Sequence, residues 1–275
     1  QKLQRMPGGR ILEDWSATPV TPSAKAFSQL IHYIWHLDES PKGTLGIDIG
    51  GAHATVVAAF EGSLHLSTQG ELGATFGGPW LMEDDPRAVL RWMPSPMEAE
   101  EARALCVNQT ARPWTVPQET HELWLQQAVL REAIRRAIQT ARTGWEPGEA
   151  LPYPSLMPIF DPILLSGGAL AGAPRPGQVA LIALDAIQPT GISTLLLDRY
   201  GLAPILGGVA SLKPLATVET LDSGGIVNLA TVVAPVGTAR KGDMILKVRV
   251  DYEEGGSLDV EVPYGSLEVL PLPPG

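Results

Sequence analysis

Cysteine and basic residues are scarce in this sequence, and each shortage excludes a class of protein. Cys106 is the only cysteine among 275 residues, so the chain alone can build neither an internal disulfide nor a thiolate zinc site. A single cysteine fits a reducing compartment, and we expect a cytoplasmic protein. Lys and Arg total 20 against 30 Asp and Glu, which gives a formal net charge of −10 at pH 7. Nucleic acid and anionic membrane surfaces would repel such a chain, so neither is the expected partner.

Long apolar runs are also lacking. No run reaches the roughly 18 to 20 residues that span a bilayer, so we expect no membrane-spanning segment. Hydrophobic residues nevertheless make up 44% of the chain and charged residues 18%, a balance that predicts a folded core. The 29 glycines and 25 prolines indicate many short elements joined by ordered connections, rather than a helical bundle.

Hydrophobic periodicity predicts a helix, then a group of strands, then three further helical stretches. Thr21 and Pro22 suit an N-cap and a first helical position, and an apolar face follows at Phe27, Leu30, Ile31 and Ile34. Strands are predicted over 45–49, 54–60 and 63–66, with glycine turns between them. Short helical stretches follow near 86–92 and 96–107, and a long amphipathic helix is expected over 117–143.

The second half of the chain alternates strands and helices and then changes to strands alone. We predict a strand at 162–165, a helix at 176–187, a strand at 193–197 and a helix at 203–212, which is the α/β pattern. Later strands are predicted at 231–233, 244–250, 258–262 and 267–270. We therefore expect an α/β domain over 1–225, with a helical insertion near 83–145, and a small β module over 226–275.

The first motif that could carry chemistry is Gly46-Ile-Asp-Ile-Gly-Gly51. Glycines let backbone N–H groups approach phosphate oxygens, and Asp48 at the strand end could hold magnesium through water. The motif lacks the Gly-Lys-Ser/Thr ending of a P-loop, and a β-like segment follows it where a dinucleotide fingerprint needs a helix. Taken alone, it also fits a tight hairpin turn with one exposed Asp.

The second motif is Leu164-Leu-Ser-Gly-Gly-Ala-Leu170. A strand that ends in two glycines before a helix leaves exposed backbone on which a base and ribose can lie. By itself it also fits an ordinary connection between a strand and a helix. The combination of a hairpin turn bearing Asp48 with a later strand–Gly–Gly–helix is more informative than either motif.

Other candidate residues have simpler explanations. His32 and His36 have the i, i+4 spacing of two metal ligands on one helix, but no cluster of carboxylates accompanies them. We expect ordinary histidines on a helix surface. Asp198 follows a predicted strand and precedes a predicted helix, where helix capping is the simpler role.

With these motifs in this order, the chain resembles the MutL family associated with glutamate mutase, which is unrelated to the mismatch-repair protein of that name. The motifs are similar to the phosphate-2 and adenosine motifs of the actin, sugar-kinase and heat-shock-chaperone ATPase superfamily. The likeness covers nearly the whole chain, with further matching stretches at 20–24, 91–94, 127–133, 184–189, 233–237 and 265–272.

This resemblance implies a ribonuclease-H-like, actin-like ATPase fold with a mixed sheet flanked by helices. It implies ATP and Mg as cofactors, and a role as reactivating or assembly factor for a cobalamin-dependent mutase or a related amino-acid-degrading enzyme. The turn residues expected to meet the phosphates and metal are Asp48, Gly50, Gly51, Ala52 and His53. The residues expected to meet the adenosine are Ser166, Gly167, Gly168 and Ala169.

Two departures from the family pattern leave alternatives open. After Asp-Ile-Gly-Gly-Ala the family tends to continue Thr-Thr-Asp, whereas this chain has His53, Ala54 and Thr55. The superfamily also has a phosphate-1 hairpin, and nothing before residue 45 supplies one, so we expect the C-terminal portion of a longer protein. The alternatives are a degenerate fold that binds a protein partner without hydrolysing ATP, and a relative of the sugar or carboxylate kinases.

Overall fold

The fold is described from a computed structural model over residues 7, 11, 14–16, 20–37, 42–60, 63–145, 156–253 and 255–270. The chain forms two compact units, Gln1–Val232 and Val233–Gly275. The sequence predicts a boundary between residues 225 and 226, and independent folding of the two parts stays a prediction.

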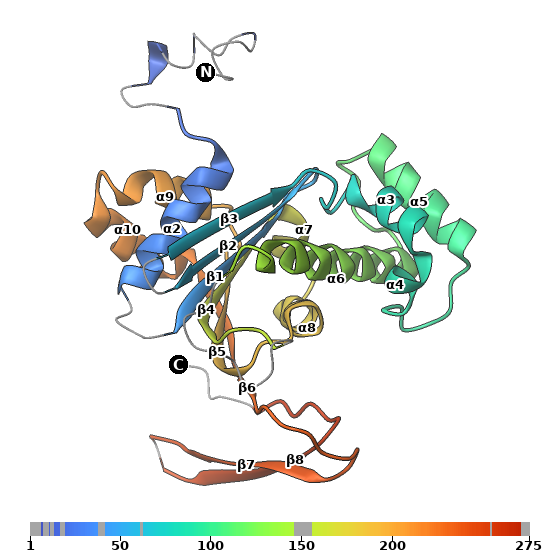
Figure 1. The fold of residues 1–275 in the computed structure, drawn as a ribbon, viewed down its shortest axis with the longest axis vertical. Helices are drawn as coiled ribbons and strands as arrows, with labels where there is room; N and C mark the ends of the chain where they lie inside the picture. Colours follow the sequence, from blue (N-terminus) through green and yellow to red (C-terminus); the bar gives the residue numbers. More distant parts are fainter. Residues whose placement is uncertain are drawn as a thin grey trace. The chain divides into compact units, whose positions relative to one another are not determined.

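The first unit is built on a six-stranded mixed sheet (Figure 1). Its strands are β1 (Gly43–Ile49), β2 (Ala54–Phe60), β3 (Ser63–Gln69), β4 (Phe160–Ser166), β5 (Gly191–Leu197) and β6 (Val227–Ala234). They lie in the order β3-β2-β1-β4-β5-β6. β1, β2 and β3 form an antiparallel meander, whereas β4 pairs parallel to β1 and β5 parallel to β4.

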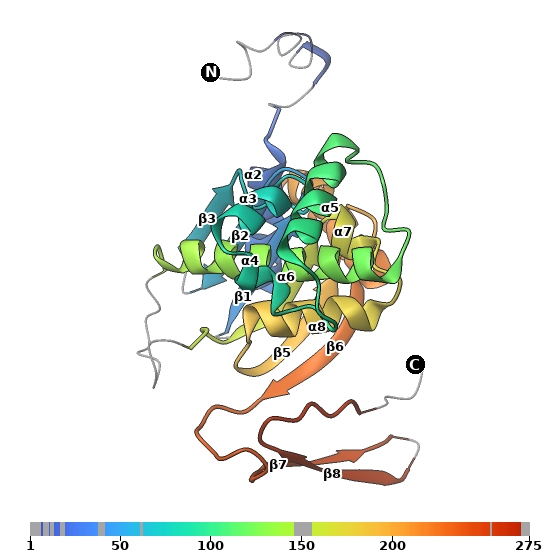
Figure 2. The same cartoon turned by 90° about the vertical axis from the view of Figure 1, so that its right-hand side faces the viewer.

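Helices cover both faces of this sheet (Figures 1 and 2). The helices are α2 (Ser23–Leu37), α3 (Gly77–Asp84), α4 (Pro86–Leu90), α5 (Ala99–Ala111), α6 (Thr120–Arg142), α7 (Gly168–Ala171), α8 (Pro176–Ile187), α9 (Ala203–Ala210) and α10 (Pro214–Thr220), with a π-turn at η2 (Leu221–Gly225). α2 and α9 pack together on one face, and α6 and α8 pack on the other. None of the described helices is long and apolar enough to cross a membrane.

The side chains of β2 contribute to two hydrophobic clusters, one on each face of the sheet. All seven of its residues are buried, and side chains alternate between the faces of a sheet. Val56 and Ala58 join the apolar cluster on the α6 and α8 side, whereas Val57 joins the cluster formed with α2 and α9. The continuous apolar sequence of this strand is therefore explained by burial on both faces.

The mixed sheet with helices on both faces confirms the expected ribonuclease-H-like α/β class. The helix predicted over 176–187 matches α8, and the long helix predicted over 117–143 is α6, over 120–142. The helical insertion expected near 83–145 corresponds to α3, α4, α5 and α6, which lie between β3 and β4.

The second unit holds a two-stranded antiparallel sheet of β7 (Met244–Asp251) and β8 (Ser257–Pro263). One expectation for this part of the chain is confirmed and one is wrong. The strand predicted at 231–233 is part of β6, which pairs within the large sheet and so completes the α/β domain. Residues 267–270 form no strand, because no described strand pairs with them after the turn at Gly265.

Candidate functional site

The two glycine motifs lie side by side at one edge of the sheet. Asp48 in β1 and Ser166 in β4 are register partners in the parallel pair, so both strands end at the same edge. Gly167 follows Ser166 with a φ of 116°, and a Cβ added there would lie 2.1 Å from the carbonyl oxygen of Ile49. Only glycine permits this contact between the motifs.

The turn after β1 is fastened to the loop that leads into α3. Within the turn, the Gly50 N–H donates to the carbonyl of His53 at 3.0 Å. The Gly50 carbonyl accepts from the Ala74 N–H at 2.8 Å, and the Gly51 carbonyl accepts from the Thr75 N–H at 3.0 Å. With both carbonyls engaged in this way, the turn has a fixed position at the sheet edge.

Asp48 is half-buried at the end of β1, beside three other polar groups. Burial raises the pKa of its carboxyl, and the nearby Asp198 raises this pKa further. His53 and the nearby hydroxyl of Ser166 act in the opposite direction and lower the pKa. The net shift is upward, so ionised Asp48 is poorly compensated by the protein and would gain from a bound cation.

Asp198 is a buried carboxylate, and both of its oxygens accept hydrogen bonds from other residues of the protein. Its Oδ1 accepts from the Leu202 N–H at 2.8 Å, and its Oδ2 accepts from the Ala203 N–H at 2.9 Å and from Ser166 Oγ at 3.1 Å. Asp198 contacts the start of α9, as expected, but the N-cap residue is Leu202, not Asp198. Its hydrogen bond to Ser166 also ties β5 to the second glycine motif, a link that the sequence does not reveal.

Both glycine motifs line one cavity of about 680 Å³. Gly51 and Thr75 contribute from the first motif and its supporting loop, and Gly168 and Ala169 contribute from the second. The opposite wall comes from the segment between α5 and α6 and includes Trp114. This volume lies within the range of about 300–1,000 Å³ usual for small-molecule sites.

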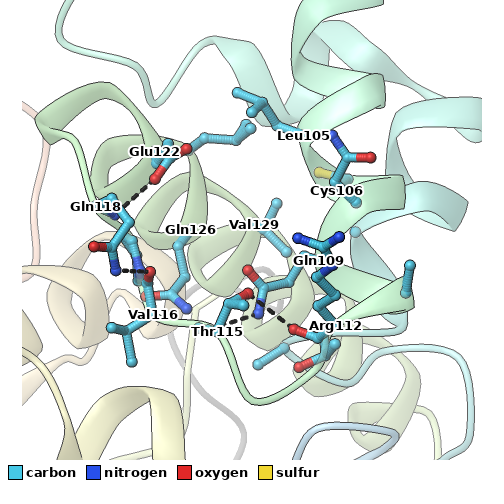
Figure 3. A pocket seen from close by; sticks show the side chains of 17 residues that line it. Leu105, Cys106, Gln109, Arg112, Thr115, Val116, Gln118, Glu122, Gln126 and Val129 are labelled. Atoms are coloured by element: carbon cyan, nitrogen blue, oxygen red, sulfur yellow. Dashed lines mark hydrogen bonds between the residues drawn. The ribbon is translucent and has the colours of Figure 1, made fainter.

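A second cavity of about 560 Å³ adjoins the first between α5 and α6 (Figure 3). The two cavities share several lining residues, among them Thr75, Gln109 and Gln126. Cys106 lies in the wall of this second cavity, where burial raises the pKa of the thiol to about 12. At neutral pH this thiol is protonated, so it is not a nucleophile.

Not every predicted site residue lies in the cavity wall. Asp48, Gly50, Ser166 and Gly167 lie at the sheet edge, near Gly51 and Gly168 in the chain, but do not line the cavity. Ala52 and His53 complete the turn and do not line it either. Sequence reasoning missed Thr75, Trp114 and Gln126, because they lie in the helical insertion and its loops, outside any motif. An isolated tryptophan in the proline-containing segment 112–119 was the one available signal.

The described residues contain no group of three or more His, Cys, Asp or Glu side chains that could hold a metal ion. His32 and His36 lie with ring centroids 4.4 Å apart and have no third such partner there. A magnesium ion at Asp48 would therefore take most of its ligands from water and phosphate oxygens, as Mg²⁺ does with nucleotides.

Comparison with solved structures finds proteins of low sequence identity and low structural similarity. Component A of the (R)-2-hydroxyglutaryl-CoA dehydratase of Acidaminococcus fermentans is 12% identical with a TM-score of 0.37, over 73% of this chain and 70% of that one. A non-polymerisable quadruple mutant of pCBH ParM is 16% identical with a TM-score of 0.37, over 72% of this chain and 54% of that one. At these TM-scores neither likeness supports an argument about function.

Comparison with sequences identifies the family. No curated protein sequence matches the chain. The family model described as MutL protein matches residues 1–224, which hold both glycine motifs, the insertion and the helices that cover the sheet. The chain therefore belongs to the MutL protein family.

Proposed function

We propose that this MutL protein binds ATP with magnesium at the shared cavity. The observation that carries the proposal is the meeting of the two glycine motifs: Gly51 and Gly168 line one cavity although they lie far apart in the sequence. We further propose that it serves as a reactivating or assembly factor for a cobalamin-dependent mutase or a related amino-acid-degrading enzyme, as the family resemblance implies.

The cavity wall exposes the backbone of Gly51 and Gly168, which phosphate oxygens of a nucleotide could approach. A Cβ added at Gly168 would meet nothing within 4 Å, and one added at Gly51 would meet only Thr75 Oγ1, at 3.6 Å. Space over these two glycines is therefore open, and ligand oxygens can approach the backbone without obstruction. The residues present fit a triphosphate.

Asp48 supplies the charge that a magnesium ion needs. Its poorly compensated carboxylate, at the end of β1, could orient water around the ion that neutralises the phosphates. Magnesium bound to ATP supplies charge neutralisation for phosphoryl chemistry. Ser166, held by Asp198, keeps the neighbouring glycine motif in register with Asp48.

Isothermal titration calorimetry with Mg-ATP tests the proposal. We expect binding to the parent chain and a loss of at least about tenfold in affinity for Asp48→Ala, since a charge-assisted contact contributes roughly 1.5–3 kcal/mol. Asp222→Ala is a matched control, because Asp222 is exposed in η2 and belongs to neither glycine motif. Absence of binding to the parent chain would remove the nucleotide proposal.

A second candidate function is a protein-binding module that keeps the fold without hydrolysing ATP. The favouring observation is Thr55, which stands where the family tends to have Asp. Thr55 is fully buried, and its Oγ1 lies 3.5 Å from Thr68 Oγ1, so it places no carboxylate at the phosphate turn. Co-purification with a mutase subunit in equal yield with and without ATP would favour this function, and a strict requirement for ATP would oppose it.

A further inference from the structure

The wall opposite the second glycine motif carries a tryptophan that no motif assigns. Trp114 is 79% exposed and lines the same cavity as Gly168 and Ala169. We propose that a purine base lies between the indole of Trp114 and the backbone of Gly168 and Ala169, and that the carboxamide of Gln126 reads the edge of the base. This inference rests on the proposed function, because it specifies how the nucleotide is recognised.

The segment that carries Trp114 has a defined conformation. The Thr115 N–H donates to the carbonyl of Arg112 at 3.0 Å, and Thr115 Oγ1 donates to the same oxygen at 2.8 Å. Gln109 Nε2 in α5 donates to the carbonyl of Thr115 at 3.0 Å. Trp114 lies between these anchored residues, so its backbone is fixed while its indole stays exposed.

The glycine-rich wall is suited to a flat ring. Gly168 and Gly172 both line the cavity, with Ala169 between them, so side chains on this wall are small. A flat aromatic ligand could therefore lie close to the backbone at the start of α7 and still contact an indole on its other face. Stacking of a base on an aromatic side chain contributes substantially and tolerates any base, so a second feature must supply selectivity.

Gln126 provides that second feature. Three glutamines line the cavity, and two have their amide nitrogens committed: Gln109 Nε2 to the carbonyl of Thr115, and Gln118 Nε2 to the carbonyl of Val116. Among the residues that the structure describes, the side chain of Gln126 makes no hydrogen bond. Gln126 also lines the adjoining cavity of about 560 Å³, which Figure 3 draws, where its side chain is labelled between those of Gln118 and Gln109. Its donor and acceptor are therefore both available to a ligand.

A free carboxamide is suited to adenine. Glutamine can accept from the exocyclic amino group of adenine and donate to a ring nitrogen at the same time. Guanine has a carbonyl oxygen in place of that amino group. Because the neighbouring Gln109 keeps its nitrogen on Thr115, its Oε1 remains as a further acceptor, which favours an amino group over a carbonyl.

Two ligands separate recognition of the base from recognition of the phosphates. The affinities for Mg-ATP and for magnesium with inorganic triphosphate are measured by calorimetry. The ligand that binds more weakly is measured by its competition with the one that binds more tightly. We expect Trp114→Ala to weaken ATP binding roughly 5- to 100-fold and to leave triphosphate binding unchanged, because triphosphate has no base to stack. Trp114→Phe should retain most of the ATP affinity, and Trp15→Ala, which removes another exposed tryptophan, should retain all of it.

Selectivity is tested with Gln126→Leu. This variant should lose roughly 5- to 30-fold in affinity for ATP and little for GTP, so that the preference for ATP shrinks. Gln29→Leu is the matched control, since Gln29 lies in α2 and lines neither cavity. Equal loss for both nucleotides would show a structural effect and would overturn the assignment to Gln126.

The outcome also distinguishes this inference from the proposed function. If Trp114→Ala binds ATP as the parent does while Asp48→Ala does not, the nucleotide site stands and the base site is elsewhere. If the parent chain binds neither ATP nor triphosphate, the nucleotide proposal fails and the base site fails with it.

Discussion

Asp48 has its unusual environment because of residues that are remote in the sequence. The glycine pair after it marks a turn, and that much is visible from the sequence. Its neighbour Ser166 ends β4 and its neighbour Asp198 directly follows β5, and only the parallel pairing of β1, β4 and β5 brings them close. The sequence could therefore indicate the motif but not the charge environment that raises the pKa of Asp48.

The raised pKa of Asp48 predicts a pH dependence of stability. Between the ordinary pKa and the raised one, the native state binds more protons than the unfolded state, so stability falls as pH rises through that window. Asp48→Asn removes the buried charge, and we expect its melting temperature to exceed that of the parent at pH 7. The difference should shrink as pH falls through the window. A lower melting temperature at every pH would contradict this.

At the scale of elements, the packing of α9 against α2 depends on one glycine. A Cβ added at Gly207 would lie 1.7 Å from the carbonyl oxygen of Ala26, so the helices would have to separate. We expect Gly207→Ala to destabilise the protein by about 1–3 kcal/mol or more in urea unfolding. The next residue is the control: nothing lies within 4 Å of a Cβ at Gly208. Gly208→Ala should be neutral or stabilising by up to about 1 kcal/mol. Equal losses of stability in the two variants would show that the close contact at Gly207 is not the cause.

α6 holds a second buried carboxylate, Glu132, whose role is structural. It accepts from Arg135 Nε at 2.9 Å and from Arg136 Nε at 2.8 Å, and its side chain is fully buried. Burial raises the pKa of Glu132, but the hydrogen bonds from these arginines outweigh it, and the net shift is downward. This stabilisation is therefore present above the ordinary pKa of Glu and is lost as pH falls through the lowered value.

Removal of this carboxylate takes the carboxylate partner from Arg135, whereas Arg136 keeps its ion pair with Asp84. We expect Glu132→Ala to lower the free energy of unfolding by about 3–5 kcal/mol at pH 7. Glu101→Ala, at an exposed position of α5, should change it by less than about 0.5 kcal/mol. Urea unfolding of both variants measures these changes. Similar losses in the free energy of unfolding for the two variants would show that the contacts between Glu132 and the arginines do not stabilise the protein.

At the scale of the whole molecule, the sequence predicted the α/β class and most elements, because each has a clear hydrophobic period. It could not assign β6 to the large sheet, since a strand pattern does not identify the partner strand. The helix pattern likewise located α5 and α6 but gave no indication of the cavity between them. The cavity residues Thr75, Trp114 and Gln126 acquire their meaning only from that packing.

The place of β6 leads to a prediction about truncation. Leu229 and Val232 in β6 pack against the main core, although the family match ends at residue 224. A chain that ends after residue 234 keeps the six-stranded sheet and should retain cooperative unfolding. A chain that ends after residue 226 lacks those side chains and leaves one edge of β5 unpaired, so it should unfold at a lower denaturant concentration. Equal midpoints for the two chains would show that β6 is dispensable.

The central claim is that the two glycine motifs contact one nucleotide at the same time. Amide hydrogen exchange measured residue by residue, with and without Mg-ATP, tests this most directly. We predict that ATP slows exchange in both Gly50–His53 and Gly167–Leu170, and that the Asp48→Ala variant shows neither effect at the same ATP concentration. Slowing in only one of the two segments, or in neither while ATP is bound, would contradict the account.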